Sequence, residues 1–278
     1  MKSTYFDLID QSYTFPQEGF SLKNGYLNFH GVSLKYLIDK YKTPFKLMYL
    51  PRISEQISKV RNHFNKTINR TGYKGKYNYA YCTKCCHFSH VVKTAAREGV
   101  HLETSSSFDI DLILHLYQEG EIDKKRILIH NGYKTEDYID KILLLSEMGF
   151  TNSIVILDSK SEIKRIRDKI KDKDTIIKIG IRMAIDEEPQ TAYYTSRLGI
   201  RPTEIVDFYK NEIKEDPNFA LKMFHFFIDS GIKDTMYYWG EFQKALAVFA
   251  ELKKVAPELK ALNLGGGFPI RNNLGFDY

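Results

Sequence analysis

The segment YNYAYCTKCCHFSH, residues 77–90, places Lys84 directly after residues typical of a buried strand. Proteins built from parallel strands and helices carry their active sites at the carboxyl ends of the strands. An amine that is partly shielded from water there has a lowered pKa and can act as a Schiff-base nucleophile. The alternative is a solvated charge at a strand end, which is the commoner role of a single lysine.

Three cysteines surround Lys84 and allow a second interpretation, a metal or redox site. Cys82 and Cys85 form a C-x-x-C pair, and Cys86 follows them. A structural zinc site needs a second pair of ligands at a distance, and the sequence contains no second C-x-x-C. A thioredoxin-like pair opens a helix, whereas Cys82 belongs to the predicted strand. We therefore assign no metal ligand, and metal or redox chemistry stays a minor alternative.

Other residues that could bind a small anionic molecule lie at the ends of further predicted strands. Gly265, Gly266 and Gly267 follow the last one, where their backbone N–H groups could bind a phosphate, although a tight turn needs the same residues. Glu103 and Arg182 are charges in buried segments, so we expect them to face a polar cavity or each other. In HFFIDSG, His225 or Phe227 could stack on a flat cofactor, and Ser230 could donate to a phosphate.

The elements that must position these residues alternate regularly from residue 77 onward. Several of the strand candidates are nearly continuous apolar runs, which is typical of strands buried on both faces of a parallel sheet. Amphipathic helical runs separate them, so the pattern predicts an open doubly wound sheet or a (β/α)8 barrel. The seven predicted strands are residues 77–82, 100–105, 126–131, 153–158, 176–184, 220–227 and 261–267.

The helices between these strands have interpretable ends. Gly99, Gly120 and Gly149 each stand where a helix should stop. Ser159 and Glu162 have the spacing of a capping box at a helix start. Residues 1–45 differ from the repeat, and the segment SLKNGYLNFHGVSLKYLIDKYKTPFKLMYL predicts a hairpin, a short helix and a further strand, as part of a separate β-rich element.

Composition bounds the class of protein. A length of 278 residues with 43% hydrophobic and 27% charged residues suits a globular α/β barrel. The net charge of +6 is modest and the charges are interleaved, so we expect no nucleic-acid partner. No apolar run approaches a membrane span and the N-terminus lacks the apolar region of a signal peptide, so we expect a cytoplasmic protein without a membrane partner.

Eight segments together carry a family resemblance. In order they are NGYLNFHGVSLKYLIDKYKTPFKLMYL, YAYCTKCCHFSHVV, HLETSSSFDIDLIL, HNGYKTEDYI, GIRMA, SRLGI, HFFIDSG and LNLGGGFP. They resemble the fold-type-III, alanine-racemase-like pyridoxal-phosphate decarboxylases and, among these, the biosynthetic arginine decarboxylases. The NGYK segment is particularly similar to the latter.

The resemblance implies a role for each matching residue. Lys84 would bind pyridoxal 5′-phosphate as an imine. Gly265, Gly266, Gly267 and Ser230 would hold its phosphate, and Glu103 and Arg182 would line the side of its ring hydroxyl. Phe227 stands where relatives place a histidine that stacks on the ring, so it can stack but cannot donate a hydrogen bond. Arg197 matches a position at the subunit interface of relatives, and His87 is assigned no role.

The resemblance also implies a fold, a reaction and partners. The fold would be a (β/α)8 TIM-type barrel truncated before its eighth strand, with residues 1–45 in an accessory β-domain and 46–278 in the cofactor-binding barrel. The sequence would then be the N-terminal portion of a longer enzyme, because the carboxylate that pairs with the pyridinium nitrogen lies on the family's eighth strand.

The implied reaction is decarboxylation of the small-molecule substrate L-arginine to agmatine, for polyamine synthesis, in a homodimer or larger homo-oligomer. Mg²⁺ is possible from the resemblance alone. Alternatives are a decarboxylase of ornithine, diaminopimelate or carboxynorspermidine, a catalytically silent regulatory homologue, and an inactive fragment.

Overall fold

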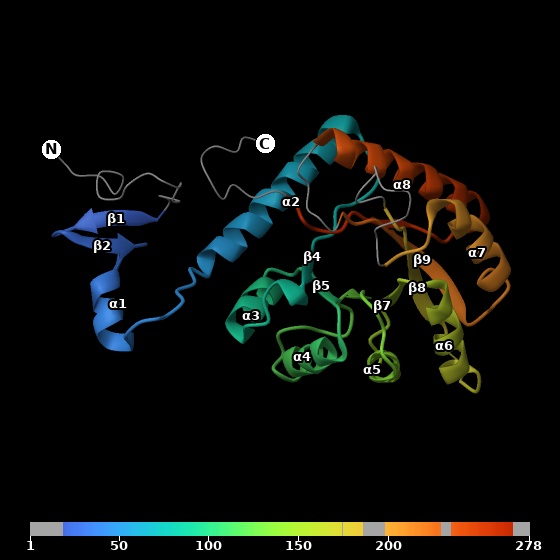
Figure 1. Cartoon of the computed structure of the whole chain (residues 1–278), viewed down its shortest axis with the longest axis horizontal. Coiled ribbons are helices and arrows are strands. Elements are labelled where there is room, and N and C mark those ends of the chain that lie inside the picture. The colour runs from blue at the N-terminus through green and yellow to red at the C-terminus, as the bar shows by residue number, and fades with distance from the viewer. Residues whose placement is uncertain (1–18, 174, 186–197, 229–234, 269–278) are drawn as a thin grey trace, which may run out of the picture. The chain divides into compact units, whose positions relative to one another are not determined.

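The computed structural model describes residues 19–173, 175–185, 198–228 and 235–268. Arg197 and Ser230, for which roles are predicted above, lie outside the described residues. The chain divides between Arg52 and Ile53, and the second unit ends at Gly267. Figure 1 labels the helices and strands of both units.

The first unit contains a small antiparallel sheet and one helix: β1 (Phe20–Lys23), β2 (Tyr26–Phe29), β3 (Val32–Ser33) and α1 (Leu34–Tyr41). Asn24 and Gly25 both have positive φ and form the two-residue turn between β1 and β2, as hairpins favour. Ser33 accepts a hydrogen bond from the N–H of Tyr36 and so caps α1. The predicted hairpin and short helix are confirmed.

The further strand predicted after this short helix is wrong. Residues 42–50 contain no helix or strand, and residues 42–48 are exposed. Pro44 lacks the N–H group that pairing in a sheet requires. The apolar residues of this segment suggested a strand, but an apolar run forms one only where a neighbouring strand supplies hydrogen bonds.

The second unit is built on one parallel sheet whose strand order is the chain order. Each strand overlaps one of the seven predicted runs, so that prediction is confirmed. The strands are β4 (Ala80–Cys82), β5 (His101–Thr104), β6 (Leu128–His130), β7 (Ser153–Leu157), β8 (Ile177–Arg182), β9 (Phe219–His225) and β10 (Ala261–Asn263).

This sheet is curled. The side chain of Asn263 in β10 donates to Glu103 in β5, with 3.3 Å between Nδ2 and Oε2. Five strand spacings would separate these residues by about 24 Å in a flat sheet. The contact across the sheet therefore requires the curvature of a (β/α) barrel, the fold predicted above. Within the described residues β4 and β10 are the two edges of the sheet.

Helices follow the strands and cover the outside of the sheet (Figure 1). They are α2 (Pro51–Thr71), α3 (Ser89–Arg97), α4 (Ser107–Gln118), α5 (Glu136–Glu147), α6 (Lys160–Ile170), α7 (Ile205–Glu212) and α8 (Thr235–Val255), with 3-10 turns at Thr83–Cys85 and Pro202–Glu204. Gly99, Gly120 and Gly149 follow α3, α4 and α5 with φ of 70°, 74° and 91°, which confirms the predicted helix ends.

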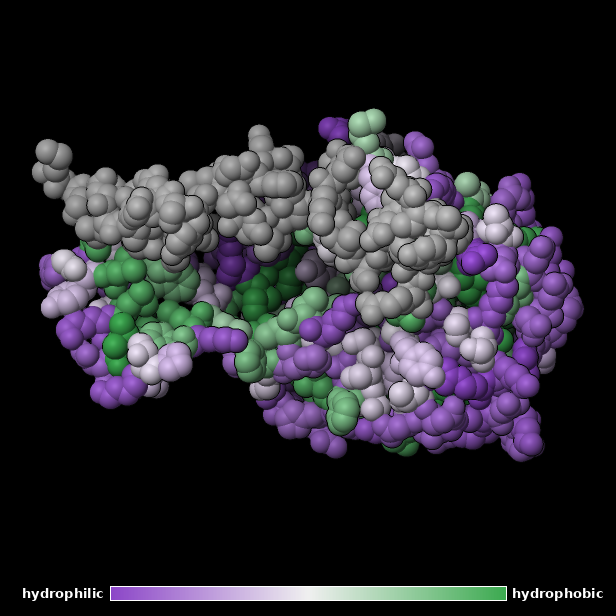
Figure 2. Space-filling view, viewed as in Figure 1, coloured by the Kyte–Doolittle hydropathy of each residue, from purple (hydrophilic) through white to green (hydrophobic). Residues whose placement is uncertain are grey.

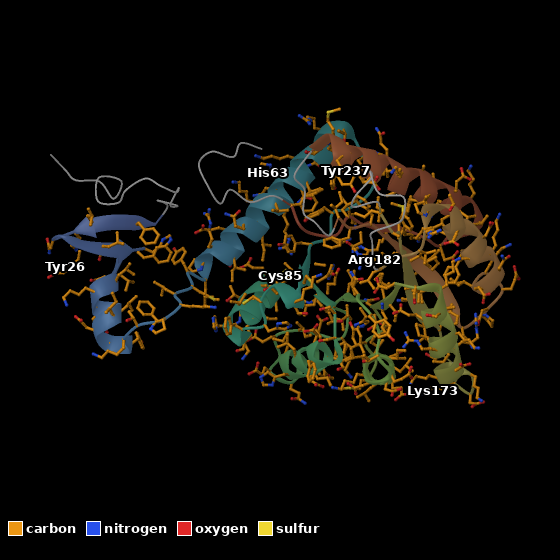
Figure 3. All side chains as sticks on the ribbon, viewed as in Figure 1. Tyr26, His63, Cys85, Lys173, Arg182 and Tyr237 are labelled. Carbon is orange, nitrogen blue, oxygen red and sulfur yellow. The ribbon has the colours of Figure 1, made fainter. Side chains whose placement is uncertain are left out.

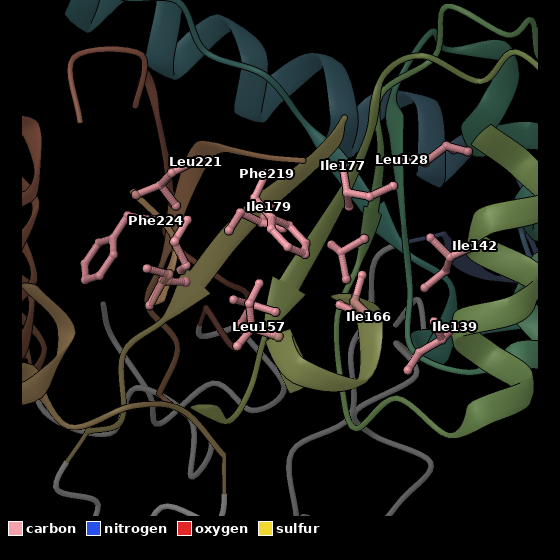
Figure 4. Close-up of a cluster of buried hydrophobic side chains, with 14 of the residues drawn as sticks. Leu128, Ile139, Ile142, Leu157, Ile166, Ile177, Ile179, Phe219, Leu221 and Phe224 are labelled. Atoms are coloured by element: carbon pink, nitrogen blue, oxygen red, sulfur yellow. The ribbon is translucent and has the colours of Figure 1, made fainter. Parts of the chain in front are cut away.

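The main core lies between the sheet and these helices. Figure 4 shows side chains of β8 and β9, such as Ile179 and Leu221, in one layer with Ile139 and Ile142 of α5 and Ile166 of α6. Each such side chain contributes about 1.5–3 kcal/mol when it is fully buried. Figure 2 shows hydrophilic residues over α6, whose Ile163, Ile166 and Ile170 are buried, so this helix is amphipathic as predicted.

Among the helices of the described residues, none combines the length and the apolar character that a membrane crossing requires.

Candidate functional site

Lys84 lies in the 3-10 turn directly after β4, at the carboxyl end of the strand. Thr83 fixes this turn, because its buried hydroxyl donates to the backbone carbonyl of Glu103 at 3.0 Å. The Tyr81 hydroxyl holds the other side by donating to the carbonyl of Cys86 at 3.1 Å. Lys84 is exposed as a residue, yet its Nζ lies 5.3 Å from the centre of the Phe227 ring. The backbone thus directs this amine toward the end of β9.

Phe227 is the residue on which the site converges. The guanidinium carbon of Arg182 lies 5.5 Å from the same ring centre, so two cations from opposite parts of the sheet share one aromatic ring. Cations are attracted to the negative face of an aromatic ring. Arg182 ends β8, and Figure 3 labels it together with Cys85, the neighbour of Lys84. His225 lies nearly parallel to Phe227, with 6.5 Å between the ring centres.

The glycine segment after β10 closes on Phe227 from another side. A Cβ atom on Gly265 would lie 2.7 Å from Cδ2 of Phe227 and 2.9 Å from the carbonyl oxygen of Phe226, so only glycine fits. Gly265 also has a φ of +68°, which side chains other than glycine disfavour. Its N–H donates to Oδ1 of Asn263 at 2.8 Å. A Cβ atom on Gly266 would meet no atom within 4 Å, so that residue faces open space.

Glu103 is held by two amides. Asn131, directly after β6, donates to its Oε1 at 3.2 Å, and Asn263 donates to its Oε2. Because Oδ1 of Asn131 accepts from the N–H of Gly132, the Asn131 amide nitrogen also donates to Nε2 of His225 at 3.0 Å. This bond requires a neutral His225, and burial lowers the pKa of His225 to about 4.

Arg182 does not pair with Glu103, which was one alternative of the sequence analysis. Its salt bridge runs instead to Asp158, with 3.3 Å between Nη1 and Oδ1, and both side chains are buried. The Nε of Arg182 is buried and has no hydrogen-bond partner among the described residues. Asp158 follows β7, one strand before Arg182, so the two charges leave neighbouring strand ends.

The structure thus brings most of the predicted site residues together. Lys84, Arg182 and Gly265 all lie against Phe227, and Glu103 joins them through Asn263. Gly266 and Gly267 follow at the same strand end. Sequence reasoning missed Asn131, Asp158 and Asn263. All three are polar residues at strand ends, so the rule that selected Lys84 would have found them had it been applied to every strand.

Within the described residues the three cysteines do not form the metal or redox site that was the alternative interpretation. All three are free. Burial, with Glu103 nearby, raises the pKa of the Cys82 thiol to about 12, whereas reactive thiols have lowered pKa values. Among the described residues no group of three or more His, Cys, Asp or Glu comes together in a way that could hold a metal ion. Mg²⁺ therefore gains no support.

His87, three residues after Lys84, has a partner that the sequence did not reveal. Its Nε2 lies 2.9 Å from Oδ1 of Asp109, whose side chain is fully buried. The other oxygen of Asp109 accepts from the N–H groups of Ser105 and Ser106. These bonds tie the loop that carries Lys84 to the start of α4.

The residues present fit the cofactor that the sequence resemblance implies. A buried guanidinium with a free Nε donor suits a phenolate or phosphate oxygen. The N–H groups of Gly266 and Gly267 make no hydrogen bond within the described residues and are available to an anion. The Phe227 ring offers a flat apolar surface, and Lys84 supplies the primary amine.

Comparison with known proteins agrees with this arrangement. Residues 52–275 match the family model for the pyridoxal-binding domain of pyridoxal-dependent decarboxylases. A curated biosynthetic arginine decarboxylase from Prochlorococcus marinus subsp. pastoris is 26% identical over 254 residues, which are 86% of this chain and 38% of that protein. The chain thus spans less than half the length of the curated relatives it matches.

Solved structures give the same picture. The biosynthetic arginine decarboxylase SpeA from Campylobacter jejuni aligns with a TM-score of 0.71 and 26% identity, covering 90% of this chain and 42% of that one. A diaminopimelate decarboxylase from M. jannaschii, solved with L-lysine, aligns with a TM-score of 0.79 over 94% of this chain and 59% of that one. Its identity is 19%, so this second likeness concerns the fold alone.

Proposed function

The chain belongs to the pyridoxal-dependent decarboxylases, of which it contains the pyridoxal-binding domain, and we propose that it binds pyridoxal 5′-phosphate through Lys84 for the decarboxylation of L-arginine to agmatine. The observation that carries the proposal is the convergence of Lys84, Arg182 and Gly265 on the Phe227 ring, because Lys84 follows β4 at the opposite edge of the sheet from β10 and Gly265.

Each residue of the site has a distinct task in this proposal. Lys84 holds the cofactor covalently through its amine, and Phe227 packs against the face of the ring. Gly265, Gly266 and Gly267 leave room for the phosphate beside the backbone, together with Ser230, whose role comes from the sequence alone. Arg182 and Glu103 line the ring-hydroxyl side. When bound, pyridoxal phosphate supplies an electron-accepting ring that stabilises the charge left as carbon dioxide departs.

The protein controls the charge around this chemistry. Lys84 and Arg182 are two cations at the Phe227 ring. His225 is held neutral by the amide of Asn131, so it adds no further positive charge. Phe227 cannot exchange a proton, so in this chain the ring-stacking residue contributes packing only.

The choice of arginine as substrate rests on the relatives. The curated protein from Prochlorococcus marinus subsp. pastoris and SpeA, both 26% identical to this chain, are named biosynthetic arginine decarboxylases, and the NGYK segment points the same way. Ornithine, diaminopimelate and carboxynorspermidine are the competing substrates. We also propose a homo-oligomer in the cytoplasm, and light scattering of the purified protein tests its oligomeric state.

Borohydride trapping tests cofactor binding at Lys84. We expect the purified protein to turn yellow with pyridoxal phosphate, and reduction to fix the label on Lys84, as peptide mass spectrometry detects. Lys84→Ala should stay colourless. The control variant Lys93→Ala removes a lysine of α3 that pairs with Glu119, and it should label like the parent. Label scattered over surface lysines would refute the cofactor assignment.

Product analysis tests the reaction separately. Unreduced protein loaded with pyridoxal phosphate that forms agmatine from L-arginine, and not putrescine from ornithine, supports the proposed substrate. Loaded, unreduced protein that is inactive with all four amino acids would contradict the decarboxylase proposal for this chain and favour a regulatory homologue or an inactive fragment.

A further inference from the structure

Lys134 is a fully buried lysine outside the residues assigned above. It ends the loop between β6 and α5, and its side chain is 0% exposed. Its ammonium donates to the backbone carbonyl of Ile156, to Oδ2 of Asp158 at 3.0 Å and to Oε2 of Glu162 at 3.4 Å. Three N–H donors thus meet three acceptors, as a buried ammonium requires.

Asp158 connects this lysine to the site. Its Oδ2 accepts from Lys134, while its Oδ1 pairs with Arg182, so each carboxylate oxygen serves a different cation. Arg182 has no other salt bridge among the described residues, and its Nε has no hydrogen-bond partner there. The position of the guanidinium beside Phe227 therefore depends on the orientation of a single carboxylate.

Charge balance explains why Lys134 decides that orientation. The buried cluster around Asp158 contains four charged side chains, two positive and two negative: Lys134, Arg182, Asp158 and Glu162. Without the ammonium, both carboxylates would share Arg182 as their buried cation. A buried carboxylate without its cation is strongly unfavourable, so Asp158 would turn toward Arg182. That change moves the guanidinium.

We propose that Lys134 is a positioning residue that fixes Arg182 through Asp158 and thereby sets the affinity of the site for pyridoxal phosphate. The positioning itself is a property of the protein alone, while its effect on affinity rests on the function proposed above. Glu162 provides a control: it is equally buried and contacts Lys134, but it does not contact Arg182. Its Oε2 also accepts from the backbone N–H of Asp158 at 2.8 Å, and Glu162→Gln keeps an oxygen acceptor for that bond.

The first experiment needs no cofactor. The side-chain Nε–H signal of Arg182 in ¹⁵N-correlated NMR spectra, assigned with Arg182→Lys, is compared in the parent, Lys134→Met and Glu162→Gln. Both variants should lower the thermal midpoint, because both disturb the buried charges. Only Lys134→Met should shift or broaden the Arg182 signal. An unchanged signal in folded Lys134→Met would overturn the proposal.

The second experiment measures cofactor affinity by absorbance titration with pyridoxal phosphate. Lys134→Met should weaken binding by about tenfold or more, since small displacements of a binding group have large effects, while Glu162→Gln should stay within about twofold. Asp158→Asn should reproduce the loss, and it decides the question if Lys134→Met does not fold. The double variant Lys134→Met/Asp158→Asn should bind pyridoxal phosphate no more weakly than either of its single variants, because both substitutions interrupt the same connection to Arg182.

The two experiments separate the possible failures. If the parent does not bind pyridoxal phosphate, the proposed function fails and the NMR comparison still tests the positioning. If the parent binds but Lys134→Met has the affinity of Glu162→Gln, the role of Lys134 at the site is refuted and its task is structural only.

Discussion

Replacement of Gly265 tests whether the segment after β10 is constrained by its contact with Phe227. The φ of Gly265 is +68°, and a Cβ atom at this position would come within 2.7 Å of the Phe227 ring, so both features are incompatible with a side chain. A residue in the left-handed region costs about 1–2 kcal/mol before any clash. The glycine is therefore required by the backbone conformation and by contact with the site's aromatic ring.

We expect Gly265→Ala to lower the free energy of unfolding in urea by at least about 1–2 kcal/mol. Gly266→Ala is the matched control next to it, because a Cβ atom there meets nothing within 4 Å. That variant should stay within about 0.5 kcal/mol of the parent. Equal effects of the two substitutions would show that the contact with Phe227 does not constrain the segment.

Two buried histidines link stability to pH. Burial lowers the pKa of His130 from 6.5 to about 3 and that of His225 to about 4. Between these values and 6.5 the unfolded chain binds protons that the folded chain does not. The free energy of unfolding therefore falls as pH is lowered through this range, by about 1.4 kcal/mol per pH unit for each histidine.

Replacement of one of them isolates its contribution. His130→Asn should make the dependence of unfolding free energy on pH shallower by about 1.4 kcal/mol per unit between pH 6 and about 4, measured by urea unfolding. A parent slope retained in His130→Asn would contradict the burial of a neutral imidazole.

At the scale of elements, the start of α4 is where a helix is joined to the loop that carries Lys84. Asp109 accepts two backbone N–H groups ahead of the helix and also contacts His87. A charged acceptor at a helix N-terminus stabilises the helix and satisfies donors that the helix leaves unpaired.

Asp109→Asn should lower the free energy of unfolding by about 1–3 kcal/mol, because an amide satisfies these donors less well than a carboxylate. Asp111→Asn, in the same helix, removes an exposed carboxylate 2.8 Å from Lys141 and should cost less than about 0.5 kcal/mol. Chemical denaturation of both variants measures the difference. A similar loss in Asp111→Asn would remove the special role of Asp109.

The elements also show how far sequence reasoning reaches. All seven strands were predicted because buried parallel strands are apolar along their whole length, a signal that is local in sequence. The capping box at Ser159 and Glu162 was wrong, because Glu162 turns inward to Lys134, 28 residues earlier. A helix-cap pattern is local, but a buried ion pair depends on which strands become neighbours. For the same reason the sequence identified Arg182 but not Asp158, its partner.

At the scale of the whole molecule, the chain contains two compact units, and an exposed irregular segment lies shortly before the division between them. The cores of the second unit consist of residues from position 53 onward. Residues 42–48 are exposed and contain Lys42 and Lys46. Exposed irregular segments are preferred sites of proteolysis.

Timed digestion with trypsin, followed by mass spectrometry, should find early cleavage at Lys42 or Lys46. The large fragment that results should keep the thermal midpoint of the intact chain, measured by circular dichroism, since it retains every residue of the three cores. Faster cleavage between β5 and β8 would contradict this division of the chain.

The sequential order of the sheet has a consequence for how the protein is made. The amine of Lys84 and the turn at Gly265 belong to its two opposite edges, yet both reach Phe227. During synthesis the first of these residues leaves the ribosome 181 positions before the last, and every intermediate strand must be in register before they meet. If Lys84 binds pyridoxal phosphate as proposed, capture of the cofactor must therefore wait until β10 has paired with β9.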